Sequence, residues 1–162
     1  MNTLGQSATT RQLAPYASTF LRLALGIGFI SAVLDRFGLL GTPGATNVAW
    51  GDFGHFAAYT ATLNPWAPDA LVGILAWLAT AAEIVFGLAL LLGLFVRPVA
   101  LAAGFLLLLF ALGMTMGTGL KTALDASVFT AAAGAFALAV LGAGPWSVDA
   151  LRAGGRKASA TR

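Results

Sequence analysis

Four apolar stretches, each long enough to cross a lipid bilayer, constrain this chain more than any other feature. They span residues 16–40, 70–96, 98–116 and 123–143. A bilayer core of about 30 Å requires roughly 20 apolar residues in a helix, and these stretches lack the polar alternation of membrane strands. We therefore predict an all-α integral membrane protein: a four-helix up-down bundle in the lipid bilayer, formed as a single domain over residues 1–162.

The composition supports this prediction and excludes several kinds of site. Hydrophobic residues make up 59% of the chain and charged residues 9%, whereas soluble domains contain about 25% charged residues. The sequence has no cysteine and a single histidine, His55, which excludes disulfides, iron–sulfur clusters and sulfur-based zinc sites. Its acidic residues are scattered, so we expect no metal site and no intrinsic cofactor. The basic residues gather beside a membrane span, so we expect no nucleic acid partner.

The connecting segments predict the orientation. Lysine and arginine accumulate on the cytoplasmic side of membrane proteins. One side of the predicted bundle carries six such residues and the other carries two: Arg11, Arg97, Arg152, Arg156, Lys157 and Arg162 against Arg36 and Lys121. We therefore expect both termini, and a basic tail over residues 146–162, to be cytoplasmic. The outer segment 41–69 is rich in aromatic residues and is predicted to contain a short interfacial helix over 52–63, between the first and second spans.

Two charged residues, Arg22 and Glu83, fall in the interior of predicted spans rather than near their ends. Charges at membrane depth are costly and mark candidate functional sites. Arg22 and Glu83 lie about 9 and 15 Å from the cytoplasmic side, at 1.5 Å per residue, so we predict an intramembrane pair. As a catalytic pair it would line a pocket for a polar headgroup or relay protons, and ion passage is a further possibility. The alternative is structural: Arg22 reaches the interface and Glu83 only fixes the helix register.

A second polar group is expected at the outer side. Asp35 and Arg36 end the first span, Asp125 begins the fourth, and His55 lies in the outer segment. One interpretation is a mouth in which these four residues bind a ligand. The other is a set of solvated helix ends. Small residues, among them Gly26 and Gly28 in the first span, are the positions where helices can approach closely.

Two sequence segments resemble the DoxX-like family of membrane proteins. FLRLALGIGFISAVLDRFG (residues 20–38) is similar to the opening helix of that family, and AAEIVFGLALLLGLFVRPVAL (residues 81–101) to its second and third helices. The matching motif positions are Arg22, Asp35, Arg36, Glu83, Gly87, Gly93 and Arg97. The family is similar to the membrane subunits of thiosulfate:quinone oxidoreductases. A related branch uses cysteine pairs for disulfide chemistry, which this cysteine-free chain does not carry over.

The resemblance implies a bacterial or archaeal cytoplasmic membrane and a link to the quinone pool. The first hypothesis is therefore a membrane subunit of a quinone-linked oxidoreductase, which binds quinone or lipid and receives electrons from a partner protein. A second is a structural accessory subunit packed against a larger membrane complex. A third is a small transporter acting as a homo-oligomer. Whether the chain is itself an enzyme stays open at this point.

Overall fold

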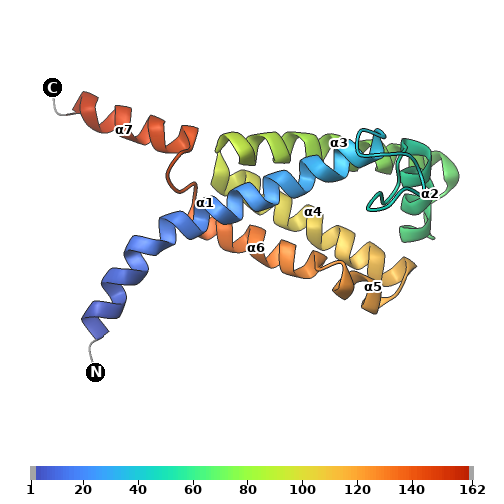
Figure 1. Cartoon of the computed structure of the whole chain (residues 1–162), viewed down its shortest axis with the longest axis horizontal. Coiled ribbons are helices and arrows are strands. Elements are labelled where there is room, and N and C mark those ends of the chain that lie inside the picture. The colour runs from blue at the N-terminus through green and yellow to red at the C-terminus, as the bar shows by residue number, and fades with distance from the viewer. Residues whose placement is uncertain (1–2, 161–162) are drawn as a thin grey trace.

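The structure is a computed structural model that describes the backbone of residues 3–160 and the side chains of residues 12–154. Within residues 3–160 all regular secondary structure is helical (Figure 1), which confirms the all-α prediction. The helices are α1 (Thr3–Arg36), α2 (Phe53–Leu63), α3 (Asp69–Leu92), α4 (Val96–Gly117), α5 (Leu120–Asp125), α6 (Val128–Leu141) and α7 (Val148–Ala160). Three helices have segments long and apolar enough to cross a membrane: Gln12–Arg36, Asp69–Leu92 and Val96–Gly117.

Part of the predicted basic tail lies outside the described residues. Arg162 does so entirely, and at Arg156 and Lys157 only the backbone is described. The same holds for Arg11, near the other chain end. The remainder of the tail forms α7, a helix that the apolar pattern alone does not predict.

The short helix predicted in the outer segment is confirmed as α2. Its N-cap is Asp52, whose side chain accepts a hydrogen bond of 2.8 Å from the backbone N–H of His55. Aspartate is among the preferred N-cap residues because its carboxylate satisfies a free N–H of the first turn. The cap residue Asp52 and the aromatic residues that follow it are therefore the sequence features that agree with this helix.

The predicted boundary between the second and third spans, at residue 97, is wrong. α3 ends at Gly93, which has a left-handed φ of 70°, and hydrogen bonds from Gly93 N to Leu90 O and from Leu94 N to Ala89 O form a Schellman motif. Pro98 lies in the first turn of α4, where a missing N–H costs nothing. The glycine, rather than the proline, marks the boundary.

The fourth predicted span, 123–143, is wrong as a single helix. α5 ends at Asp125 and α6 begins at Val128, because Ser127 between them has a left-handed φ of 55° and this conformation interrupts an α-helix. α6 has 14 residues, about 21 Å at 1.5 Å per residue. The last apolar stretch is therefore a short helix preceded by a single turn.

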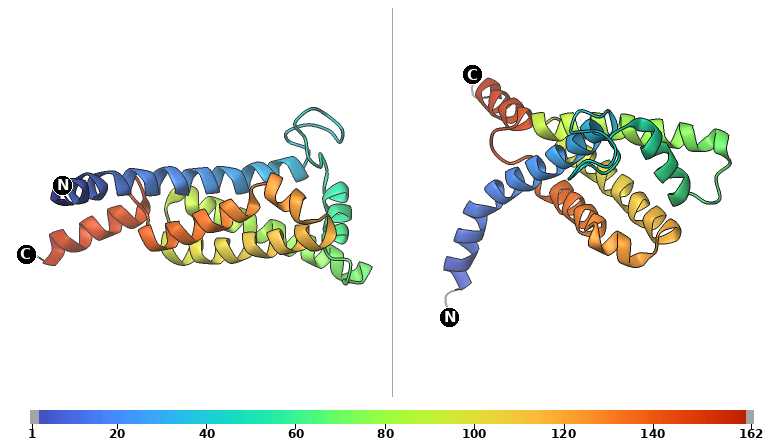
Figure 2. Two further views of the ribbon diagram at one scale, coloured as in Figure 1. Left: turned by 90° about the horizontal axis from the view of Figure 1, so that it is seen from below. Right: turned by 45° about the vertical axis from the view of Figure 1, so that its right-hand side comes forward.

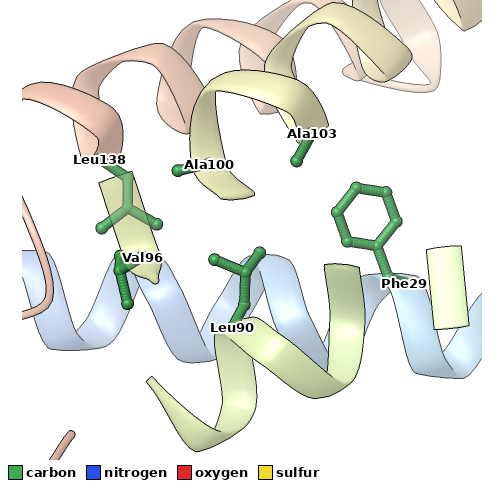
Figure 3. Packing of buried hydrophobic residues seen from close by; sticks show 6 residues of the cluster. All are labelled: Phe29, Leu90, Val96, Ala100, Ala103 and Leu138. Carbon is green, nitrogen blue, oxygen red and sulfur yellow. The ribbon is translucent and has the colours of Figure 1, made fainter. Parts of the chain in front are cut away.

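The long helices pack as two close pairs. α1 packs along α3, α4 packs along α6, and smaller contacts join α1 to α6 and α3 to α4. The buried core between the pairs consists of the residues drawn in Figure 3, which are Phe29, Leu90, Val96, Ala100, Ala103 and Leu138. α2 packs on α3 and α4 at the end of the molecule opposite to both chain ends (Figures 1 and 2).

Candidate functional site

A cavity of about 1340 Å³ lies between the two helix pairs, lined by residues of α1, α2, α3, α4 and α6. The cavity is open to the surroundings on one side, because several of its lining residues, among them Leu78, Leu109 and Met116, are exposed. Small side chains form part of its wall: Ala24, Gly28 and Ala32 of α1 line it and share one helix face because they are four residues apart. The cavity is therefore a consequence of small residues at positions where larger ones would fill it.

Gly26 and Gly28, two residues apart on α1, differ in their surroundings. A Cβ atom at Gly26 would lie 2.9 Å from Leu91 Cγ, so Gly26 is a position of close approach to α3, as predicted. A Cβ atom at Gly28 would meet no atom within 4 Å. The prediction that Gly28 is also a contact position is therefore wrong, and this glycine borders open space.

The polar part of the cavity wall lies toward the end covered by α2. The polar side chains that line it are Arg36, Trp50, Tyr59, Thr60, Asn64, Glu83, Ser127 and Thr130. These come from the end of α1, the segment before α2, α2 itself, the middle of α3 and the start of α6. Toward the chain termini the wall consists of apolar residues, among them Leu21, Leu25 and Leu106. The cavity thus has a polar end and an apolar end.

A buried ion pair forms part of the polar end. Arg36 Nη2 donates to Glu83 Oε1 at 2.8 Å, and the two side chains are 3% and 2% exposed. Arg36 Nη1 also donates to Thr80 Oγ1 at 3.1 Å. An ion pair with so little contact with solvent is costly to assemble, and it requires good geometry and further hydrogen bonds to be tolerated. Glu83 Oε2 and Arg36 Nε have no hydrogen-bond partner among the described residues.

Arg36 also connects α3 to the outer segment. Its guanidinium carbon lies 3.7 Å from the ring centroid of Phe56 in α2 and 5.1 Å from that of Trp50. Cation–π contacts of this kind strengthen when the groups are removed from water. One side chain at the end of α1 therefore holds both the middle of α3 and the helix that covers the cavity.

The predicted pair of Arg22 and Glu83 is not formed. Arg22 instead donates to the backbone carbonyls of Leu90 and Leu91 at 2.6 and 2.8 Å, and to that of Trp146 at 3.0 Å. The reason is the register of α1 against α3. Arg22 lies opposite the last turn of α3, seven residues or about 10 Å beyond Glu83 along the helix, and this places Arg36 beside Glu83 instead.

Arg22 has a structural position at the termini end of the molecule. The last carbonyls of a helix have no partner within the helix, and a cation there is favoured by the helix dipole. Ser18 and Thr19 reinforce the same end by donating to the carbonyls of Gly142 and Pro145. The segment after α6 is thereby fastened to α1 at this end of the molecule.

Asp149, which was not among the predicted site residues, also holds this end of the molecule together. Its two carboxylate oxygens accept hydrogen bonds from the backbone N–H groups of Phe95 and Val96 at 3.0 and 2.8 Å, so it caps the N-terminus of α4 from the start of α7. A carboxylate at a helix N-terminus is stabilising. No local sequence signal indicates this contact, because more than fifty residues separate the partners.

The predicted outer mouth is not assembled as a ligand-binding group. Asp35 is buried, and its carboxylate accepts hydrogen bonds from the backbone N–H groups of Ala49, Trp50 and Gly51. The residue holds the loop before α2 against the end of α1, and its oxygens are occupied by that loop.

His55 and Asp125 are also held elsewhere. His55 Nδ1 lies 2.9 Å from Asp52 Oδ2, and Lys121 Nζ lies 2.6 Å from Asp125 Oδ2. Both pairs are exposed and local in sequence. Among the described residues no ion pair joins them to Arg36 or Glu83. Of the predicted mouth residues, Arg36 alone lines the cavity.

Acid is expected to weaken the N-cap of α2. The backbone hydrogen bond from His55 is the main cause that lowers the pKa of Asp52 below its ordinary value, and the hydrogen bond from the His55 side chain adds to it. The folded chain therefore binds this proton less tightly than the unfolded chain. The stabilisation is complete above the unfolded pKa and is lost as pH falls through the lower folded pKa. The protection factors of the α2 amides, which are the intrinsic exchange rates at each pH divided by the observed ones, should fall as the pH is lowered from neutral to below about 3.9.

Asp52→Asn is the matched control for this prediction, because asparagine is an equally good N-cap and does not titrate. Its α2 amides should exchange with no comparable acid-dependent step. If the protection factors of the variant fell in acid as much as those of the unchanged chain, Asp52 would not be the responsible group.

Comparison with known proteins gives one match. The family model described as DoxX matches residues 17–116, which is more than half of the chain. The match includes α1 from residue 17 onward, all of α2 and α3, and nearly all of α4. Neither a curated protein nor a solved structure matches the chain. The matched region contains both Arg36 and Glu83.

Proposed function

Since the chain belongs to the DoxX family and has several membrane-spanning apolar helices, it is an integral membrane protein, and we propose that it is a membrane subunit of a quinone-linked oxidoreductase. In this proposal the cavity binds quinone or a lipid-like molecule and the chain handles protons. The observation that carries the proposal is a large apolar cavity with a buried ion pair at one end.

The proposed membrane placement uses four crossings. α1, α3 and α4 are full-length spans, and α6 with the turn of α5 is a shorter fourth one, which gives an up-down bundle. Both chain ends lie at the same end of the molecule (Figure 2). By the positive-inside rule this end faces the cytoplasm of a bacterium or archaeon, and α2 faces outward.

The division of chemistry follows from the residue inventory. The sequence contains no cysteine and one histidine, so a partner protein supplies the electrons. This chain supplies a binding site and titratable groups. Glu83 has one carboxylate oxygen without a hydrogen-bond partner among the described residues, and a carboxylate so placed can accept a proton if the ligand or a small movement of the wall brings a donor to it.

Filling the cavity should remove the bound molecule. Gly28→Phe places a ring where a Cβ meets no neighbour within 4 Å, so the fold is retained while the ligand space is occupied. We expect the affinity for a quinone with a decyl tail to fall by about tenfold or more, equivalent to about 1.4 kcal/mol or more. Binding can be measured by native mass spectrometry and by titration in mild detergent.

Gly73→Phe is the matched control. Gly73 lies in α3, a Cβ there also meets nothing within 4 Å, and the residue is not part of the cavity wall. The control should bind as the unchanged chain does. Equal binding by both variants would show that the cavity is not the binding site.

A second candidate function is an accessory subunit in a larger complex. It is favoured by the parts of α1 and α7 that extend beyond the bundle at the termini end (Figure 1), where they are available to another protein. Co-migration with a large assembly, without a bound small molecule, would favour this role over the first.

A further inference from the structure

The cavity is asymmetric along its length, and we infer that it holds a neutral-headed amphiphile in a single direction. The head lies under α2, at the end opposite both chain termini, and the apolar tail runs between α1 and α6 toward the termini. This inference rests on the proposed function, because it assumes that the cavity binds an amphiphilic molecule.

The head subsite is defined by four polar side chains next to α2. Trp50, Tyr59, Thr60 and Asn64 line the cavity there. The Thr60 hydroxyl already donates to the carbonyl of Phe56, and one amide N–H of Asn64 donates to the carbonyl of Thr60, both at 2.9 Å. The donors left for a ligand are the indole, the phenol and the second amide N–H of Asn64. Burial raises the pKa of the Tyr59 hydroxyl, so this group stays protonated and neutral at physiological pH. The subsite can therefore bind carbonyl and hydroxyl oxygens by hydrogen bonds, which are the polar groups of a quinone or quinol ring.

The charge of the cavity wall selects against an anionic head. Among the residues that the structure describes, Arg36 and Glu83 are the only charged ones that line the cavity, and they neutralise each other at 2.8 Å. A phosphate or sulfate head would need an unpaired cation or several aligned donors. The lining offers no such cation, and a neutral ring requires none.

The tail subsite is formed by apolar residues toward the termini. Leu21, Leu25, Leu106, Leu107 and Gly134 line it. It narrows where α1 meets α6, since a Cβ atom at Gly134 would lie 3.1 Å from Leu21 Cδ1. From Arg36 to Leu21 the wall of α1 is about 22 Å long at 1.5 Å per residue. An extended hydrocarbon tail fits this length, whereas a second polar group would meet no polar partner in the wall.

The two ends of the molecule each contain a natural reporter, which allows the direction to be tested. Trp50 lines the polar end, whereas Trp146 lies at the termini end and outside this cavity. One variant keeps Trp50 alone (Trp66→Phe, Trp77→Phe, Trp146→Phe), and the other keeps Trp146 alone (Trp50→Phe, Trp66→Phe, Trp77→Phe). Both are titrated in mild detergent with decylubiquinone, whose ring quenches tryptophan fluorescence at close range, while native mass spectrometry records binding.

We expect the fluorescence of Trp50 to be quenched until the quinone site is saturated. The fluorescence of Trp146 should show only weak quenching that rises with quinone concentration and does not saturate. Addition of phosphatidylglycerol should not displace the quinone. Saturable quenching of Trp146 instead would overturn the direction, and displacement by phosphatidylglycerol would overturn the neutral head, while both results would leave a ligand-binding cavity intact. Absence of a bound quinone in both variants and in the unchanged chain would instead refute the proposed function, and the inferred direction with it.

Discussion

Replacing Arg36 with alanine should destabilise the protein by about 3–5 kcal/mol, the typical cost of removing one partner of a buried ion pair. Glu83, which is almost inaccessible, loses its cation, and Thr80 and Phe56 lose their contacts with the guanidinium. Thermal unfolding in mild detergent, followed by circular dichroism, measures the loss. We also expect faster hydrogen exchange in α2, because Arg36 connects this helix to α3.

An exposed ion pair provides the control. Lys121 and Asp125 are 2.6 Å apart with side chains 86% and 64% exposed, and such pairs contribute at most about 1 kcal/mol. Lys121→Ala should therefore change the unfolding temperature little.

The double variant Arg36→Met, Glu83→Leu should recover most of the stability lost in Arg36→Ala, since it removes both buried charges. A double variant no more stable than the single one would contradict the explanation.

Replacing Arg22 with methionine should have the second large effect. The side chain keeps its apolar stem but leaves the carbonyls of Leu90, Leu91 and Trp146 without the guanidinium donor. Leu90 O keeps its hydrogen bond from Gly93 N, and the bonds from Arg22 to the carbonyls of Leu91 and Trp146 are only partly buried. A buried acceptor without a partner costs about 1–3 kcal/mol, so we expect a total loss of about 1–3 kcal/mol. Hydrogen exchange should accelerate in the segment 142–147 and in the last turn of α3, while α2 stays protected.

Arg97→Met is the corresponding control, because Arg97 is exposed and lies near the same segment. Its unfolding temperature should stay close to that of the unchanged chain. Were Arg22→Met to loosen α2 rather than the termini end, the assignment of Arg22 to the fastening of that end would be incorrect.

Arg22 and Arg36 show what the sequence can and cannot predict. The long helices follow from apolar length, and α2 follows from Asp52 and the aromatic residues after it. Pairing within the membrane depends on the register between two helices. Arg22 and Arg36 are both on α1. An error of about two turns in the predicted register between α1 and α3 is therefore enough to give Glu83 the wrong arginine as its partner. The depth of each residue in the membrane does not determine this register.

Other misses have equally local causes. The interruption at Ser127 contains neither glycine nor proline, so the sequence has no ordinary marker of a helix break there. Gly28 was predicted to be a contact position because small residues usually let helices approach. In the structure the same small size leaves space, and this difference depends on how far apart the two helix pairs lie.

The shortness of α6 has a consequence for the surrounding lipid. In the proposed four-span placement, its length of about 21 Å falls well below the bilayer core of about 30 Å, so this flank of the bundle would present a hydrophobic mismatch that its neighbours do not. Membranes respond to a short span by thinning locally or by bringing proteins together. We therefore expect acyl chains to be compressed beside α6, which makes this flank the favoured place for self-association in thick bilayers.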